Sequence, residues 1–274
     1  MYPIRWLTDF APLHALCAQE GWLGDPYERI LLQNTSPYLA FGAFDGPVCI
    51  GAITGFLHEK SAWISHFVVA PSYRGKGLGR KLFEHLLGIL ENESDSFYLH
   101  AAPQMEAFYA SFGFYPSHSV TRYFRASNTP TFFFEPGQDF KPALPSLRLR
   151  MHDANAFGER RNVFLEHALS HPSSLIFCTP SGYLHSRMME GKYLFLGPWV
   201  TEKKEDAETF LNALLFFRGA KPIVADVPTL PHIASLYERY GFVAKGTTLH
   251  MQKGSPLPLA HKRIYAYAST GVYG

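Results

Sequence analysis

The stretch of this sequence best equipped for chemistry is a basic, glycine-rich turn between residues 74 and 81. Its glycines are Gly75, Gly77 and Gly79, and its basic residues are Arg74, Lys76, Arg80 and Lys81. Glycine lets a backbone close around an anion because no Cβ stands in the way. The first N–H groups of a helix lack intrahelical partners and carry partial positive charge. A helix that begins at this turn would therefore create a binding site for pyrophosphate.

The residues on either side of the turn predict a strand and a helix that hold it. Before the turn, Trp63–Val69 is rich in β-branched and aromatic residues, which is typical of a partly buried strand, and Pro71 ends that strand. After the turn, apolar residues recur at helical spacing and form one apolar face. They are Leu78, Leu82, Phe83, Leu86, Leu87 and Leu90. The turn is thus expected at the N-terminus of an amphipathic helix.

The spacing of the glycines decides which known phosphate-binding motif the turn matches. A P-loop requires G-x-x-x-x-G-K-[ST], but the residue five positions after Gly75 is Arg80. The dinucleotide fingerprint G-x-G-x-x-G also fails, because the glycines alternate. Together with the strand before it and the helix after it, Arg74-x-x-Gly77-x-Gly79 resembles the acyl-CoA signature [RQ]-x-x-G-x-[GA] of the GNAT superfamily of N-acetyltransferases.

This resemblance implies that the first half of the chain binds acetyl-CoA, the acyl donor, and needs no metal. The turn would hold the pyrophosphate, and the strand before it would pair with the pantetheine arm as an extra strand does. A backbone N–H of that strand would also serve the oxyanion of the tetrahedral intermediate. The residues implied to bind the donor are Phe67, Val68, Val69, Arg74, Gly75, Lys76, Gly77, Leu78, Gly79, Arg80 and Tyr109.

Tyr109 and His66 are the candidate catalytic residues. Tyr109 stands four residues before Gly113-Phe114, where the resemblance implies a tyrosine that protonates the leaving thiolate. The alternative is that it only packs its helix on the sheet. His66 lies on the strand before the turn and, with an ordinary pKa near 6.5, is able to accept the proton of the amine. His100 and a chain of water molecules are the alternative bases.

The resemblance implies an α/β (α+β) fold with a mixed, mostly antiparallel central sheet flanked by helices, and the local patterns agree with it. Helical patterns run from residue 7 to 33. The expected strands are Tyr38–Phe44, Val48–Leu57, Trp63–Val69, Phe97–His100 and Val120–Arg125, and a second helix is expected at Pro103–Phe112. On the acceptor side the resemblance suggests Trp22, Tyr27 and Arg29, with simple packing as the alternative.

The second half of the chain repeats the first. Pro103-x5-Tyr109-x3-Gly113-Phe114 recurs 128 positions later as Pro231-x5-Tyr237-x3-Gly241-Phe242, and the apolar residues of the long helix recur at the same offset. We therefore expect two GNAT-like domains in tandem, over residues 1–135 and 146–274. A segment rich in proline and glycine, FEPGQDFKPALP, joins them.

At this offset the second half lacks the glycine-rich turn. Arg74–Gly79 corresponds to Glu202–Ala207, which contains no glycine and has three acidic residues: Glu202, Glu205 and Asp206. Negative charge there opposes the phosphates of a cofactor in a low-dielectric cleft. We expect that the second domain is degenerate and does not bind CoA in the usual way. Its acidic residues would instead suit the first turn of a helix.

The composition excludes several other classes of protein. The 274 residues are 47% hydrophobic and 18% charged, as expected for a globular protein with a core, and the net charge of +2 gives no electrostatic case for nucleic acid. Three scattered cysteines argue for a reducing compartment, and the pair His167 and His171 lacks the glutamate of a zinc motif. No apolar run is long enough to span a membrane. A cytoplasmic protein, monomeric or homodimeric, is expected.

The expected function is the transfer of an acetyl group from acetyl-CoA to a primary amine of a small molecule, a peptide or a protein, by direct attack in a ternary complex. The alternative is a non-catalytic module that binds or senses acyl-CoA. A third interpretation keeps the reaction but changes the donor to a longer acyl-CoA. The sequence leaves the acceptor open.

Overall fold

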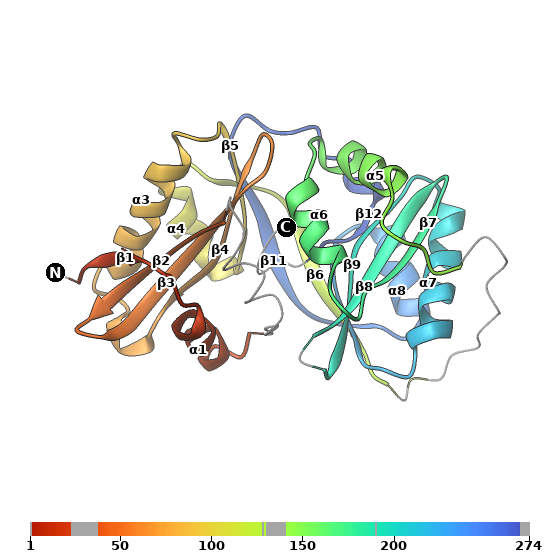
Figure 1. Cartoon of the computed structure of the whole chain (residues 1–274), viewed down its shortest axis with the longest axis horizontal. Coiled ribbons are helices and arrows are strands. Elements are labelled where there is room, and N and C mark those ends of the chain that lie inside the picture. Colours follow the sequence, from red (N-terminus) through yellow and green to blue (C-terminus); the bar gives the residue numbers. More distant parts are fainter. Residues whose placement is uncertain (1, 23–37, 128, 130–140, 190, 269–274) are drawn as a thin grey trace.

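The chain folds into two halves that lie side by side (Figure 1). The structure is a computed structural model and describes residues 2–22, 38–127, 129, 141–189 and 191–268. The first half contains β1 (Ile4–Trp6), α1 (Ala11–Gln19), β2 (Tyr38–Asp45), β3 (Val48–Leu57), β4 (Ala62–Val69), α3 (Leu78–Leu90), β5 (Ser96–Ala101), α4 (Glu106–Ala110) and β6 (Tyr115–Arg125). Short 3-10 turns at Pro71–Tyr73 and Pro103–Met105 precede α3 and α4.

The second half repeats this order of elements after two helices. It contains α5 (Leu147–Phe157), α6 (Asn162–Leu169), β7 (Leu175–Thr179), β8 (Gly182–Met189), β9 (Tyr193–Thr201), α7 (Lys204–Arg218), β10 (Ile223–Pro228), α8 (Pro231–Arg239), β11 (Val243–Gly254), a 3-10 turn (His261–Arg263) and β12 (Ile264–Ala266). The strands of both halves are mostly antiparallel and helices flank them, so the predicted fold class is confirmed.

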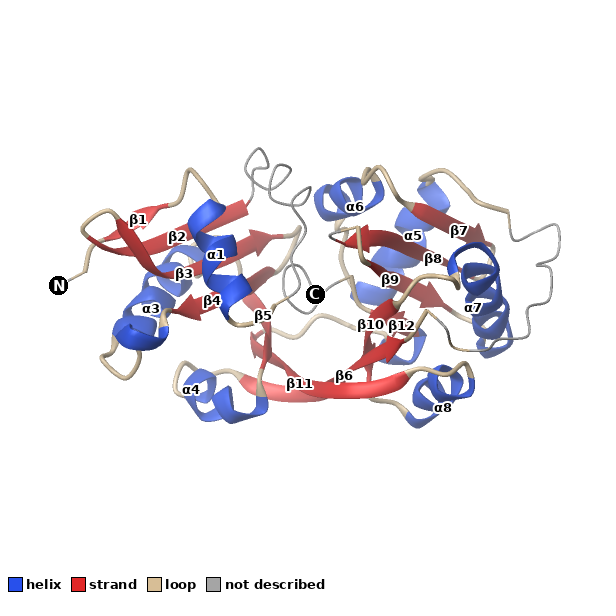
Figure 2. Ribbon diagram, turned by 90° about the horizontal axis from the view of Figure 1, so that it is seen from below, coloured by secondary structure: helices blue, strands red, loops and turns tan. Residues whose placement is uncertain are grey.

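The two halves exchange their last long strands. The strand order is β1-β2-β3-β4-β5-β11-β6-β10-β9-β8-β7, so one sheet runs through the whole described chain. β11 comes from the second half but pairs with β5 of the first, and β6 comes from the first half but pairs with β10 of the second. Figure 2 shows the two exchanged strands crossing between the halves. The predicted division into residues 1–135 and 146–274 describes the repeat in the sequence. In the structure, each half of the sheet contains one strand from the other half of the chain.

Hydrophobic cores lie on both sides of this sheet. All six residues of the predicted apolar stripe of α3 are buried, which confirms that prediction, and α7 buries the equivalent face in the second half. Full burial of a Leu or Phe side chain contributes roughly 1.5 to 3 kcal/mol. A third core lies between the halves, where α1 of the first meets α5 and α6 of the second.

Two predicted elements have different bounds in the structure, and other predictions fall outside the described residues. The predicted helix at Pro103–Phe112 is a 3-10 turn followed by the short α4, and the last predicted strand of the first half begins earlier, at Tyr115. Of the helical pattern between residues 7 and 33, α1 is described. Residues 23–37 and most of the predicted linker are outside the described part of the chain. Among the described helices, none is long and apolar enough to cross a membrane.

Candidate active site

A gap opens between β4 and β5 at the centre of the first half. The two strands pair in parallel at Ala62–Ile64 and Phe97–Leu99, and within the described residues no pairing continues beyond Ile64 and Leu99. A bulge in β4 lies immediately after this point, because the register with β3 shifts there, and His66 takes a positive φ of 45°. Since a bulge bends its strand and ends regular pairing, β4 diverges from β5 and leaves a strand edge without a partner strand among the described residues.

The glycine-rich turn lies at the end of β4 and begins α3, as predicted. Gly77 is the N-cap residue of α3 with a φ of +77°, and among the described residues no side chain caps this helix. Gly75 also has a positive φ, of 72°. These are conformations that residues with a Cβ rarely adopt. The first N–H groups of α3 therefore lack a side-chain partner in the described part of the chain, and an added Cβ at Gly75 or Gly77 would have nothing within 4 Å.

Gly79 is needed for a different reason. A Cβ at Gly79 would meet the ring of Phe67 at 3.2 Å, so the first turn of α3 packs directly on β4. This contact fixes the helix N-terminus beside the strand edge. The basic turn and the unpaired edge of β4 are thereby held next to each other.

Arg74 is anchored at the base of the turn. Its Nε donates to the carbonyl oxygen of Val69 at 2.8 Å, and its guanidinium forms an ion pair with Glu20 at the end of α1. The Arg74 side chain is 47% exposed. Because exposed ion pairs contribute only about 0 to 1 kcal/mol, an incoming phosphate is able to compete with Glu20 for this guanidinium.

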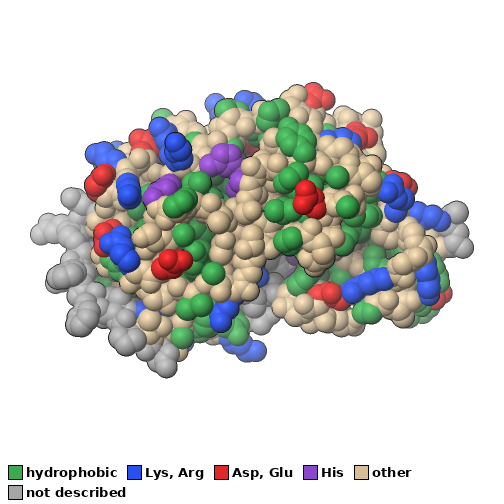
Figure 3. Space-filling model, turned by 180° about the vertical axis from the view of Figure 1, so that it is seen from behind, with side chains coloured by type: hydrophobic (Ala, Val, Ile, Leu, Met, Phe, Trp, Pro, Cys, Tyr) green, Lys and Arg blue, Asp and Glu red, His purple; other side chains and the backbone are tan. Residues whose placement is uncertain are grey.

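Lys76 and Arg80 lie on the exposed rim of the turn. Lys76 donates from Nζ to the carbonyl oxygen of Ser72 at 2.8 Å. Arg80 donates to the Ser111 hydroxyl at 2.8 Å and stacks over the ring of Phe112, with 4.6 Å between the guanidinium carbon and the ring centroid. Both cations therefore sit beside the N-terminus of α3, where they add positive potential. On the face seen in Figure 3, by contrast, acidic and basic side chains are interspersed.

The Tyr109 side chain lies under the gap on the α3 side of the sheet. Its ring is buried among aromatic rings, with Phe67 and Phe83 at 6.3 and 5.4 Å between centroids. Within the described residues its hydroxyl forms no hydrogen bond, and it is not among the fully enclosed polar atoms. Burial raises the pKa of Tyr109 well above its usual value, so the phenol keeps its proton at neutral pH.

His66 lies on the opposite face of β4. Its Nδ1 is 3.3 Å from the Tyr38 hydroxyl and 3.2 Å from the Thr54 hydroxyl. Burial, together with the nearby His14, lowers the pKa of His66 to about 3, so its imidazole is neutral at pH 7. The structure thus places the two candidate catalytic residues on either side of the gap, with Tyr109 below it and His66 above it.

Residues 67–69 of β4 also face alternately towards the two sides of the sheet. Phe67 and Val69 join the core beneath α3, whereas Val68 faces the core between the halves. His100 lies one residue beyond the last paired position of β5. Of the proposed acceptor-side residues, Trp22 is 43% exposed and Tyr27 and Arg29 lie outside the described residues.

Comparison with known families identifies both halves of the chain. The model of the acetyltransferase (GNAT) family matches residues 6–114, and the model of an acetyltransferase (GNAT) domain matches residues 149–266. The chain belongs to the GNAT acetyltransferase family. The two matches confirm the predicted tandem of GNAT domains. None of the curated proteins matches the sequence.

Solved structures share the tandem GNAT fold over nearly the whole chain. A proposed acetyltransferase from Pyrococcus horikoshii is 20% identical with a TM-score of 0.83, covering 98% of this chain and 95% of that one. A tandem GNAT protein from the clavulanic acid biosynthesis pathway is 14% identical with a TM-score of 0.64, covering 93% and 98%. A GCN5-related N-acetyltransferase from Sphaerobacter thermophilus is 15% identical with a TM-score of 0.62, covering 94% and 98%. At these identities the likeness shows the fold.

The second GNAT domain has the same gap, but the chain itself fills it. β9 and β10 pair in parallel only at residues 194–196 and 223–225. β12 lies in the space that follows, since it pairs with β9, and the N–H of Tyr267 donates to the carbonyl oxygen of Asp226 on β10 at 2.8 Å. A Cβ on Gly197 of β9 would overlap the carbonyl oxygen of Tyr267, so this close approach requires glycine. Sequence analysis did not predict this strand.

The acidic residues of the second GNAT domain have partners of their own. Glu202 accepts from Arg263 at 3.2 Å, and Asp206 accepts from the Ser181 hydroxyl. Glu205 and Asp206 lie in the first turn of α7, as expected. Tyr237, the counterpart of Tyr109, donates its hydroxyl to the carbonyl oxygen of Tyr265 in β12 at 3.0 Å.

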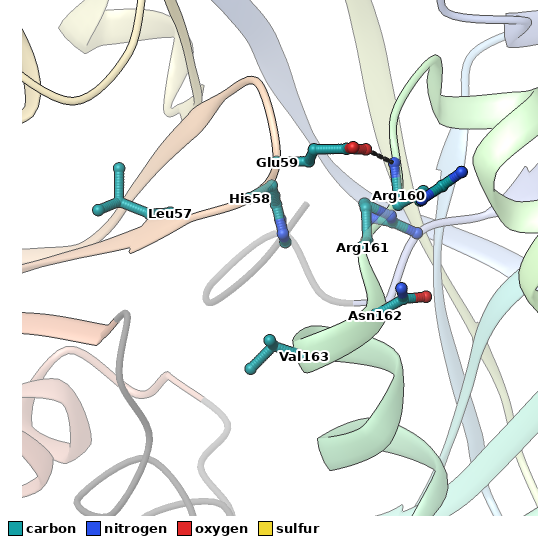
Figure 4. Close-up of a pocket in the computed structure, with 7 residues that line it drawn as sticks. All are labelled: Leu57, His58, Glu59, Arg160, Arg161, Asn162 and Val163. Atoms are coloured by element: carbon teal, nitrogen blue, oxygen red, sulfur yellow. Dashed lines mark hydrogen bonds between the residues drawn. The ribbon is translucent and has the colours of Figure 1, made fainter.

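A cleft of about 350 Å³ lies where the two GNAT domains meet (Figure 4). It is lined by Leu57, His58, Glu59, Arg160, Arg161, Asn162 and Val163. Beside it the two domains hold each other by reciprocal bonds. The Glu59 carboxylate accepts from the N–H of Arg160 at 3.1 Å, and the Glu159 carboxylate accepts from the N–H of Lys60 at 2.7 Å.

Metal chemistry has no visible site in the described residues, because no group of three or more His, Cys, Asp or Glu side chains is arranged to hold an ion. His171 of the pair noted in the sequence instead contacts the Ser173 hydroxyl through Nδ1 at 2.8 Å.

Proposed function

We propose that this protein is an acetyl-CoA-dependent N-acetyltransferase whose one active site lies in the first GNAT domain. The observation that carries the proposal is the contrast between the two gaps. In the first domain the strand edge is open and the Tyr109 hydroxyl has no partner among the described residues, whereas in the second both are occupied by β12. An open edge beside a polar group without a partner is a site built for a ligand.

The residues of the first gap fit acetyl-CoA. The N-terminus of α3, with Arg74, Lys76 and Arg80 around it, would hold the pyrophosphate. The exposed edge of β4 at Phe67–Val69 would pair with the amide groups of pantetheine, since those groups offer the donors and acceptors of a strand. The thioester would then lie between Tyr109 and the α1 face of the sheet.

The reaction needs a proton to leave the amine and another to reach sulfur. The amine nitrogen attacks the thioester carbonyl from the α1 face, a nitrogen–carbon bond forms, and a backbone N–H of β4 stabilises the oxyanion. The carbon–sulfur bond then breaks and Tyr109 donates its proton to the sulfur. The burial that raises the pKa of Tyr109 acts equally on a thiolate in the same site, so proton transfer between them stays feasible.

The acceptor amine arrives on the face that carries His66 and His100. Both imidazoles are neutral at pH 7, because burial lowers their pKa to about 3 and about 4. A neutral imidazole is able to accept a proton, either directly or through water. We propose a small-molecule or peptide amine as the acceptor and the acetyl group as the acyl group transferred.

We also propose that the protein works in the cytoplasm. Its three cysteines, Cys17, Cys49 and Cys178, are free thiols. Burial raises the pKa of Cys17 to about 12, so this thiol stays protonated and inert. Unpaired thiols are typical of a reducing compartment.

Release of CoA thiol from acetyl-CoA in the presence of a panel of amines tests the proposed function. The wild type should release thiol faster with at least one amine than with none, and Gly77→Glu should abolish this release. Gly88→Glu is the matched control, because it adds the same charge at an exposed position of α3 where nothing lies within 4 Å. Acetyl-CoA binding without transfer to any amine would favour the acyl-CoA-sensing alternative instead.

A further inference from the structure

Three histidines lie side by side across the exchanged strands, next to the open gap. His250 on β11 is the register partner of His100 on β5 and also of His118 on β6. Ring centroids are 5.2 Å apart between His100 and His250 and 4.4 Å apart between His250 and His118. Since opposite residues of adjacent strands point to the same face, they form one row, which we call the histidine row.

The far end of the histidine row is joined by hydroxyl groups. A register shift between β11 and β6 leaves Ser117 as an extra residue, and its hydroxyl lies 2.7 Å from Nδ1 of His250 and 2.9 Å from Nδ1 of His118. Nε2 of His118 is 2.7 Å from the hydroxyl of Tyr267, which follows β12. Ser117 is exposed, so the histidine row reaches solvent at this end.

The near end of the histidine row has ring nitrogens without protein partners. Both ring nitrogens of His100 and Nε2 of His250 are enclosed and form no hydrogen bond within the described residues. Leaving a buried polar atom without a partner costs about 1 to 3 kcal/mol. Such atoms are the usual sites of ordered water or of a functional contact. A cluster with only a packing role would gain by having apolar rings here.

This near end lies beside the proposed reaction site. His100 is the first residue of β5 beyond the last position paired with β4, at the point where the gap begins. Its neighbours Leu99 and Ala101 belong to the core beneath α3, so His100 points to the opposite face, away from Tyr109. The ring of Trp63 on β4 lies 5.6 Å from His100 on that face.

We propose that the histidine row carries away the proton that an ammonium acceptor must lose before it attacks the thioester. Water carries the proton from the acceptor nitrogen to His100, whose ring nitrogens are enclosed, and one further water molecule passes it to His250. The exposed Ser117 then delivers it to solvent, while His118 contacts Ser117 and is itself held by the buried Tyr267, so that His250 and these three are positioning residues. The proposal rests on the proposed function, and it means that the second half of the chain completes the active site of the first.

The protons balance over the whole reaction. An ammonium ion loses two protons when it becomes an amide. The first leaves through the histidine row and makes the nitrogen nucleophilic. The second passes from nitrogen to solvent after the nitrogen–carbon bond forms, while Tyr109 gives its proton to sulfur as the carbon–sulfur bond breaks and then regains a proton from solvent. CoA thiol, the amide and one free proton are the products.

The rings of the row are neutral at pH 7, so they pass a proton along without storing it. Burial lowers the pKa of His100 to about 4 and that of His118 to about 3, and it lowers the pKa of His250 well below the ordinary value. Each ring is therefore neutral at pH 7 and is able to take a proton on one nitrogen while releasing one from the other. Burial of the acceptor ammonium also lowers its pKa, which makes the first transfer easier.

The charged groups around the row are few and balanced. The groups that act on it from the packed elements are Asp226 on β10, Arg122 on β6, His261 in the 3-10 turn before β12, and the phenols Tyr98 and Tyr267. Arg122 and Asp226 form a two-bond ion pair at 2.7 Å, so their opposing effects on His100 largely cancel. By contrast, Nδ1 of His66 contacts the hydroxyls of Tyr38 and Thr54 rather than a member of the row.

Two amines of different basicity test this relay. Butylamine is an ammonium ion at pH 7.5 and must lose a proton before attack, whereas hydroxylamine arrives neutral. In the full-length protein, His250→Gln should lower the rate of thiol release with butylamine by roughly 10- to 100-fold. It should change the rate with hydroxylamine by less than about twofold, since the first proton transfer is bypassed. The loss with butylamine should shrink as the pH is raised and neutral amine accumulates.

A milder pair of variants keeps the test independent of folding. Tyr267→Phe removes only the hydroxyl that contacts His118, and Tyr265→Phe is its control, since Tyr265 is equally buried two residues away and its ring packs in the other core. We expect Tyr267→Phe to reproduce the butylamine-specific loss in part and Tyr265→Phe to show none. Equal losses with both amines would overturn the relay, because they would indicate a structural role.

The outcomes separate this proposal from the proposed function. If the wild type transfers acetyl groups to both amines and the row variants behave like the wild type, the relay is wrong and the N-acetyltransferase stands. If the wild type acetylates neither amine nor any other, both proposals fall.

Discussion

The two halves of this molecule contain the same gap between parallel strands in opposite states. In the first half, β4 and β5 diverge around an open strand edge, and the Tyr109 hydroxyl beside it forms no bond to a described residue. In the second half, β12 occupies the gap and the hydroxyl of Tyr237 bonds to it at 3.0 Å. We therefore propose that the same backbone geometry serves as a ligand site in the first half and as a structural joint in the second, where the chain fills it.

The loops beside the two gaps also differ in the contacts that their residues make. Gly77 caps α3 with a positive φ and leaves the helix N-terminus free for an anion. At the start of α7, Asp206 accepts a hydrogen bond from Ser181, and the preceding Glu202 pairs with Arg263 next to β12. Thus Glu202, one of the acidic residues that we propose exclude phosphate, also helps to hold the strand that closes the gap.

Separating the halves should have the largest effect, because each sheet depends on a strand from the other. A chain ending at residue 145 leaves β5 without β11 and β6 without either of its neighbours. We expect this fragment to be unfolded, as measured by circular dichroism and a missing cooperative urea transition. Co-expression with residues 146–274 should restore a folded complex. A fragment that folds alone and binds acetyl-CoA would show that the exchanged strands are dispensable.

The two equivalent tyrosines should differ most clearly in catalysis. Tyr109→Phe removes the proposed proton donor and should lower kcat by about 100- to 10,000-fold while leaving acetyl-CoA affinity nearly unchanged. Tyr237→Phe removes a structural hydrogen bond and should cost about 1 kcal/mol of unfolding free energy without lowering kcat. Thiol-release kinetics and urea denaturation measure both. Similar kcat values for the two variants would reduce Tyr109 to a packing residue.

Replacing either of two glycines with positive φ by alanine should destabilise the protein, but by different amounts. Gly197→Ala places a Cβ against the carbonyl oxygen of Tyr267 and should lower the free energy of unfolding by about 3 kcal/mol. Gly77→Ala meets nothing within 4 Å, so only backbone strain remains, at about 1 to 2 kcal/mol. Urea denaturation measures the difference. An equal cost for both would mean that β12 is loosely held in its gap.

The smallest expected effect is on the pH dependence of stability. Burial lowers the pKa of His100 to about 4, whereas an unfolded histidine titrates near 6.5. Between these values the unfolded chain binds more protons, so the free energy of unfolding falls as the pH falls from about 6.5 towards 4. His100→Gln should show a smaller fall between pH 7 and pH 5 in urea denaturation. An unchanged pH dependence would mean that His100 titrates alike in both states.

Local features of the site could be predicted from the sequence because local chemistry determines them. The apolar stripe of α3, the turn at Arg74–Gly79 and the tyrosine before Gly113 each depend on residues close together in the chain. The family and the tandem repeat also followed from such motifs, and the comparisons confirm them. The residue roles at the site stay predictions until activity is measured.

The long-range pairings could not be predicted. β6 and β11 are equivalent strands of a repeat, so their patterns suit either sheet and give no sign of the exchange. β12 has only three residues, too few for a periodic signal. The histidine row depends on the exchange, because His250 is 150 positions from its neighbour His100 in sequence. A histidine pattern of this kind becomes visible only when the strand order is known.

Calorimetric titration of the full-length protein with acetyl-CoA tests the central claim most directly, because its stoichiometry counts the open gaps. We predict one molecule bound per chain, with binding lost in Gly77→Glu and kept in Gly88→Glu. Two molecules bound per chain would contradict the claim that β12 and the acidic loop close the second gap. No binding at all would contradict the assignment of the first gap as an acetyl-CoA site.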